Sequence, residues 1–271
     1  MVMKKYRLIL AYLIIGCMIS CSSNSGDDDA AGTPDPGGVD RSANLLATGA
    51  SANDILSNDN FDRLVIEIGF VAGFRPTTAA MTEFEEYLRE RTFKEDIEII
   101  FNEIPSPAEE ALELQEIADF ETQHRTAYND GSTIAIYIFF ADAPADSDDN
   151  ENGLVTLGAV YRNTSMVIYE STIRRLSDRS SLVTTADVEA ATLNHEFGHL
   201  FGLVNLGTPV VNDHEDPEAQ NHCVINPCLM RAELSFGSSA MKMLSDIAAK
   251  GGAAPELDAE CILDLQANGG R

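Results

Sequence analysis

Basic residues and long apolar runs are both scarce in this sequence. The 271 residues include 18 lysines and arginines against 44 aspartates and glutamates, which gives a formal net charge of -26. Nucleic acid is thereby excluded as a partner, because a phosphate backbone binds to a basic surface. The apolar run from Leu8 to Ile19 is shorter than the roughly 20 residues that a membrane-spanning helix needs. No internal repeat is present, so the apolar content of 44% favours one main folded domain.

Histidine is also rare, but four of the five histidines fall between positions 195 and 222. A helix that carries two histidines by chance gives no reason for such a cluster. His195 and His199 stand four residues apart in an H-E-x-x-H motif, so on a helix they lie on one face about one turn apart. Two such imidazoles can bind one metal ion, and a catalytic zinc takes three protein ligands and leaves one position to water. The motif therefore predicts a zinc site on a helix that starts near Ala186.

Two further residues of this stretch and the third metal ligand determine the chemistry. Glu196 follows the first histidine, where its carboxylate can take a proton from a zinc-activated water. Gly202 allows the helix to end and the chain to turn back toward the metal with a third ligand. His222, His214 and Asn205 are the open alternatives for that ligand, although an amide binds zinc poorly beside imidazole.

The motif resembles that of the metzincins, a group of zinc metalloproteases. Their pattern is HExxHxxGxxH, followed by a methionine-containing turn beneath the metal. His195, Glu196, His199 and Gly202 match this pattern, whereas Asn205 stands where the third histidine belongs. The resemblance implies a metzincin-like catalytic domain with an active-site helix and a Met-turn.

Within that group the chain resembles the archaemetzincins, whose third histidine is followed by cysteine, four residues, cysteine, one residue and methionine. His222, Cys223, Cys228 and Met230 reproduce this spacing, displaced by an insertion of about 17 residues after position 204. The resemblance implies that His222 is the third ligand and Met230 the turn methionine. The later cysteine pair that gives archaemetzincins a second zinc is absent, since only Cys261 follows.

The cysteine count favours an oxidising compartment. If Cys21 carries lipid and Cys17 is removed, an odd number of thiols is left: Cys223, Cys228 and Cys261. A bridge between Cys223 and Cys228 would close a small loop, and Cys261 could replace either partner. One thiol would stay unpaired. Zinc binding by these cysteines is the less favoured alternative outside the cytosol.

Apolar periodicity predicts alternating strands and helices upstream of the motif. Expected strands cover residues 64–71, 96–104 and 133–140, and expected helices cover residues 77–91 and 106–128. This order predicts an α/β (α+β) fold with a mainly parallel twisted sheet and right-handed crossovers. Shorter strands at 154–161 and 165–169 would form an edge that can bind an extended peptide.

Two segments outside these elements are expected to carry no catalytic chemistry. Residues 142–153 form an acidic loop, which we interpret as solvated rather than as a calcium site, because its glycine is misplaced for an EF-hand. The tail predicts two amphipathic C-terminal helices, residues 238–250 and 255–267, which would cover the lower half of the site.

The N-terminus resembles the export signal of bacterial lipoproteins. Residues 1–20 combine a basic start with the short apolar run, and a small serine precedes Cys21, so we expect a lipid anchor on Cys21. Cys17 is a competing acceptor, and an ordinary signal peptide with soluble secretion is the alternative. Residues 21–44 are acidic and contain helix breakers, which predicts a flexible tether. Residues 45–271 would then be a catalytic domain anchored at the membrane of the cell envelope.

The sequence as a whole predicts a monomeric zinc endopeptidase that acts on a peptide or protein substrate. Zn2+ would be held by His195, His199 and His222, with Glu196 as general base. The alternative is a catalytically weak or inactive binding lipoprotein on a metzincin-like fold. Asn205 suggests this alternative because it stands where the third histidine belongs. Zinc-dependent hydrolysis of another bond is a third interpretation, because activated water attacks any suitable electrophile.

Overall fold

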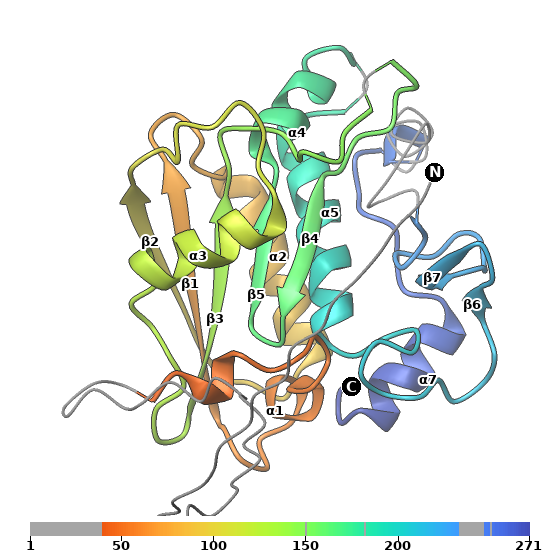
Figure 1. The fold of residues 1–271 in the computed structure, drawn as a ribbon. Helices are drawn as coiled ribbons and strands as arrows, with labels where there is room; N and C mark the ends of the chain where they lie inside the picture. Colours follow the sequence, from red (N-terminus) through yellow and green to blue (C-terminus); the bar gives the residue numbers. More distant parts are fainter. Residues whose placement is uncertain (1–39, 150, 182, 233–246, 250) are drawn as a thin grey trace, which may run out of the picture. The chain divides into compact units, whose positions relative to one another are not determined.

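A five-stranded, mainly parallel sheet forms the centre of the described structure (Figure 1). Its strands, in the order β2-β1-β3-β5-β4, are β2 (Asp96–Ile104), β1 (Arg63–Val71), β3 (Thr133–Phe140), β5 (Ser165–Ile168) and β4 (Gly158–Arg162). Every pair of neighbours is parallel except β4 and β5. The predicted α/β fold with a mainly parallel sheet is therefore confirmed, and β4 is the expected short strand at the edge.

The computed structural model describes residues 40–149, 151–181, 183–232, 247–249 and 251–271. The expected signal peptide of residues 1–20, Cys17, Cys21, most of the tether and most of the helix expected at 238–250 lie outside the described residues. A short 3-10 helix, η1 (Ser42–Asn44), starts the described chain, and its buried Asn44 donates to the Ala135 carbonyl at 3.2 Å. Packing onto the sheet thus begins before residue 45. In the described parts of the chain no helix is long and apolar enough to cross a membrane.

Helices cover both faces of this sheet (Figure 1). Three of them, α2 (Thr78–Arg91), α4 (Glu170–Ser177) and α5 (Thr185–Leu200), pack on one face, and α3 (Leu114–His124) packs on the other. β3 shows the consequence for sequence, since Ile136 and Ile138 pack toward α5 while Tyr137 and Phe139 pack toward α3. A strand covered on both faces reads as continuous apolar sequence. The other elements are α1 (Ala52–Leu56), β6 (Glu215–Asp216), β7 (Ala219–Cys223) and α7 (Ala259–Ala267).

The helix expected from residue 106 to 128 was placed too early, because α3 begins only at Leu114. Ala108 has a left-handed φ of 62°, which a helix excludes. Two backbone hydrogen bonds to the 144–146 loop hold Leu112 in an extended conformation. Leu112 N donates to Pro144 O at 3.0 Å, and Leu112 O accepts from Asp146 N at 3.1 Å. The capping box of α3 is formed instead by Glu113 and its partner Glu116. A contact distant in sequence therefore overrides the local start signal.

Carboxylates of the acidic loop, residues 142–153, accept hydrogen bonds from backbone amides of the loop and of the residues that follow it. Asp148 Oδ1 accepts from Thr156 N at 2.7 Å, and Asp149 Oδ1 accepts from Glu151 N at 3.1 Å. These bonds lead the chain into β4, so the loop helps to set the position of the edge strand.

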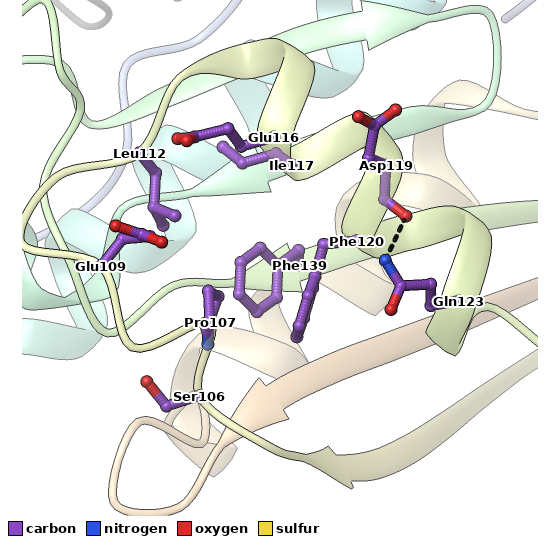
Figure 2. Close-up of a pocket in the computed structure, with 10 residues that line it drawn as sticks. All are labelled: Ser106, Pro107, Glu109, Leu112, Glu116, Ile117, Asp119, Phe120, Gln123 and Phe139. Carbon is purple, nitrogen blue, oxygen red and sulfur yellow. Dashed lines mark hydrogen bonds between the residues drawn. The ribbon is translucent and has the colours of Figure 1, made fainter.

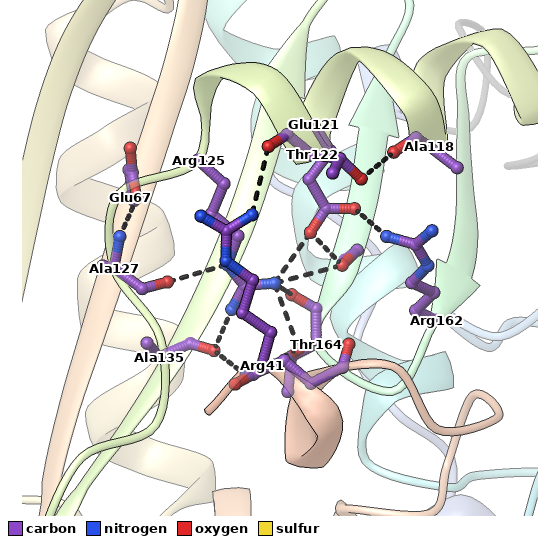
Figure 3. Close-up of polar contacts among 12 residues, drawn as sticks. Arg41, Glu67, Ala118, Glu121, Thr122, Arg125, Ala127, Ala135, Arg162 and Thr164 are labelled. Carbon is purple, nitrogen blue, oxygen red and sulfur yellow. Dashed lines mark hydrogen bonds and ion pairs between the residues drawn. The ribbon is translucent and has the colours of Figure 1, made fainter. Parts of the chain in front are cut away.

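A buried ion-pair network joins α3 to the sheet (Figure 3). Arg125 donates to Glu121 at 2.7 Å and to the Ala135 carbonyl of β3 at 2.7 Å, while Arg162 of β4 donates to the other Glu121 oxygen at 3.0 Å. The Arg125 and Glu121 side chains are buried, so each charge depends on the other for compensation. The network fixes α3, β3 and β4 relative to one another.

A second buried carboxylate cluster supports the first half of α5. Glu189 accepts from Thr77 N at 3.0 Å, at the point where α2 begins, and Glu170 of α4 is paired with Arg174. Burial, together with the adjacent Glu189 carboxylate, raises the pKa of Glu170 to about 9. Glu170 therefore carries a proton at neutral pH, which it can share with Glu189. The contacts of Glu189 with Glu170 and Thr77 join α5 to α4 and α2.

The protonation of Glu170 predicts a pH-dependent stability. A carboxyl whose pKa is raised from 4.5 to about 9 in the folded state stabilises that state most below pH 4.5, and this contribution is lost as the pH rises toward 9. We expect the free energy of unfolding, measured by urea titration, to fall less steeply across this window in Glu170→Gln. Glu86→Gln, at an exposed position of α2, should keep the wild-type slope. Equal slopes for Glu170→Gln and wild type would contradict the assignment.

Candidate metal centre

Three histidines meet beside the C-terminal half of α5. His195 and His199 come from α5 itself, and His222 comes from β7. The ring centroids are 4.9 Å apart for His195 and His199, 5.4 Å for His195 and His222, and 5.0 Å for His199 and His222. One nitrogen from each ring lies within 4.8 Å of the other two. Nitrogens bound to one tetrahedral zinc are about 3.4 Å apart, so small side-chain rotations suffice for these rings to share one ion.

Backbone carbonyls fix the orientation of two of these rings. His195 Nδ1 lies 2.7 Å from the Leu229 carbonyl, and His222 Nδ1 lies 2.9 Å from the Gln220 carbonyl. Because a carbonyl only accepts, Nδ1 is the protonated nitrogen in both rings and Nε2 keeps its lone pair. A metal-binding histidine ordinarily has such a partner on its second nitrogen.

Burial keeps the two imidazoles of α5 uncharged. Burial, with a smaller contribution from His222, lowers the pKa of His195 to about 3. Burial also holds the pKa of His199 well below its usual value, with His195 adding to the effect. Neutral imidazole is the form that binds a metal ion. The three donors and their spacing fit a zinc site with one position left for water.

Glu196 is buried between α5 and the edge strand β4. It follows His195 in the helix, and its side chain packs against Gly158, the first residue of β4. The predicted base is therefore adjacent in sequence to one metal-binding candidate and next to the strand at the sheet edge.

Met230 packs directly beneath the helix that carries the two histidines. The Met230 sulfur fills the space where Gly198 would carry a Cβ, so the glycine between the histidines allows this approach. Met230 O accepts from Cys223 N at 2.7 Å, which ties the turn to the residue after His222. Met230 thus lies against the helical turn between His195 and His199.

The two alternatives for the third ligand lie elsewhere. The amide of Asn205 donates to Glu215 at 2.5 Å and accepts from Val210 N at 3.2 Å. The His214 ring is buried against Asp264, with Nε2 2.9 Å from Oδ2. Of the three candidates, the structure brings only His222 to the pair on α5.

His214 belongs instead to a second group of potential ligands. His214, Cys223, Asp258 and Cys261 offer donor atoms that all lie within 4.8 Å of one another. Cys228 joins them, with its sulfur 3.5 Å from that of Cys261. Thiolate and imidazole are the donors that structural zinc prefers, so this group can also hold a metal ion.

The disulfide considered between Cys223 and Cys228, or between either of them and Cys261, is wrong, because these three described cysteines are free thiols. Hydrogen bonds from Cys223 and Cys261 lower the pKa of Cys228, which favours thiolate in this group. The physical reason for the error is the convergence of three sulfurs with an imidazole and a carboxylate. Sequence spacing alone did not reveal that α7 brings Cys261 and Asp264 to this place.

A hollow of about 400 Å3 lies on the opposite, α3-covered face of the sheet (Figure 2). Phe120, Phe139 and Leu112 form its apolar part, and Glu109, Glu116 and Asp119 are on its acidic side. Phe139 points away from α5, so this hollow is separate from the three histidines.

Comparisons with known proteins find matches among solved structures. No family model matches the chain, and no curated protein matches it. Among solved structures it is similar to the archaemetzincin of Methanopyrus kandleri, with 19% sequence identity and a TM-score of 0.48, over 76% of this chain and 96% of that chain.

The two ligand groups predict two distinguishable metal sites. In the cobalt-substituted protein, the group with sulfur ligands should give a thiolate-to-metal charge-transfer band, which a site with only imidazole ligands lacks. We expect His222→Ala to keep this band and lose one equivalent of metal, and His214→Ala to weaken the band. His124→Ala on α3 is the matched control and should bind metal as wild type does. A charge-transfer band that disappears in His222→Ala and persists in His214→Ala would contradict the assignment.

Proposed function

We propose that this protein is a zinc-dependent endopeptidase. The observation that carries the proposal is the convergence of three buried imidazoles with a carboxylate, Glu196, next to one of them in sequence. When bound there, zinc would supply an activated water and polarisation of the substrate carbonyl.

The residues of the chain have separate tasks in this reaction. His195, His199 and His222 hold the ion, and the carbonyls of Leu229 and Gln220 keep two of these rings in the required tautomer. Glu196 accepts the proton of the attacking water and passes it to the leaving amine. Burial of the carboxylate keeps bulk water from competing for that proton.

The edge strand β4 supports a peptide as the substrate. Among the described strands β4 pairs only with β5, so its outer edge presents backbone donors and acceptors. Because β4 starts beside Glu196, a peptide added to this edge as a further strand would pass close to the base. An extended polypeptide is the substrate that such an edge recognises.

The position of His222 disfavours an inactive binding module. That alternative depended on Asn205 at the expected third ligand position. With His222 next to His195 and His199, the chain supplies three imidazoles without Asn205.

The N-terminal sequence supports anchoring of this enzyme at the cell envelope. We propose a lipid on Cys21 and a monomeric domain that reaches its substrate on the tether of residues 21–44. The high negative charge of the chain fits a domain exposed to an aqueous compartment.

Removal of the base should separate catalysis from metal binding. We expect Glu196→Gln to keep its zinc and to lower kcat for peptide hydrolysis by about 100-fold or more, the usual contribution of a general base. Zinc content and cleavage of a peptide library are the two measurements. Glu218→Gln, which removes a charge from an exposed turn, is the control and should cleave as wild type does. Peptide cleavage at the wild-type rate by Glu196→Gln would rule out the base assignment.

A further inference from the structure

We propose that Gly158 is a positioning residue for Glu196, an inference that rests on the proposed function. A Cβ built on Gly158 would lie 2.7 Å from Glu196 Cγ and 2.9 Å from Oε1. These separations are shorter than any ordinary carbon contact. The glycine at the start of β4 thus leaves the space in which the carboxylate lies.

Steric space, rather than backbone conformation, makes glycine necessary at this position. Gly158 lies outside the left-handed region, unlike Gly202 with its φ of 74°. Alanine can therefore adopt the backbone conformation found here. The consequence of a substitution is confined to the contact with Glu196.

The strand cannot retreat from the added methyl group. The preceding Leu157 is buried, and its carbonyl accepts from Tyr169 N at 2.8 Å. Thr156 N is held by Asp148 at 2.7 Å, and Gly158 is paired with Ile168 of β5. The backbone from Thr156 to Gly158 is therefore held by the sheet and the acidic loop.

The helix cannot retreat either, whereas the Glu196 side chain can move. α5 is buried on all sides over its C-terminal half, and Met230 packs against Gly198 from below. The atoms that a methyl group would meet are Cγ, Cδ and Oε1 of Glu196, all of which move when the side chain rotates about χ1. Gly158→Ala should therefore displace the carboxylate and leave the histidines in place.

A displaced base predicts lost turnover with intact metal binding. A shift of about 1 Å in a catalytic group costs about 100-fold in rate. For Gly158→Ala we expect kcat to fall by about 10- to 100-fold, as this dependence of rate on position indicates. KM should change little, and the zinc content should stay unchanged. In a crystal structure of the metal-loaded variant, the carboxylate should be displaced while β4 and α5 superpose on those of wild type. Ala159→Ser adds an atom to the opposite face of β4 and should leave Glu196 unmoved.

A double-mutant cycle tests whether the contact acts through Glu196. Glu196→Ala removes the atoms that the methyl group meets, so Gly158→Ala should lower the thermal midpoint in the Glu196 background and leave it unchanged in the Glu196→Ala background. If Gly158→Ala alone does not fold, Gly158→Ala/Glu196→Ala should restore folding.

The proposal is overturned by an equal loss of stability in both backgrounds, or by a crystal structure in which β4 moves and Glu196 does not. A wild-type protein that binds zinc and cleaves no peptide would refute the proposed function, and the crystal and stability measurements would still decide the role of Gly158.

Discussion

The burial of polar side chains along α5 is the constraint on which the rest of the structure depends. Glu189, His195, Glu196 and His199 are all buried on one helix. Each polar group removed from water must find a partner, because an unsatisfied one costs about 1–3 kcal/mol. Glu189 is satisfied by Thr77, and His195 by the carbonyl of Leu229. The elements around α5 are placed where they supply these partners.

Close packing allows these partners to reach the helix. Gly198 lets the Met230 sulfur approach α5, and Gly158 lets β4 approach Glu196 on the sheet-edge side. In both places the side chain of another residue, Met230 or Glu196, occupies the space that a Cβ would take. Glycine acts here as a gap in the packing, and its conformational freedom is not used at these two sites.

The segment of residues 205–221 connects two groups of potential metal ligands. It delivers His222 to the pair on α5, and it delivers His214 to the thiols near α7. His222 and Cys223 are consecutive residues of β7, so the two groups share one strand. A metal ion held by the thiol group would therefore stabilise the strand that carries His222.

The sequence by itself determined the parallel sheet and the helix that carries His195 and His199. Those features follow from periodicities of two and 3.6 residues and from spacing within short segments, which depend on local geometry. Only the tertiary structure decided that α3 starts at Leu114, that His214 joins Cys223 and Cys261, and that Gly158 borders Glu196. Each of these depends on contacts between residues far apart in the chain. The energy of such contacts comes from packing and partner geometry, to which local spacing gives no access.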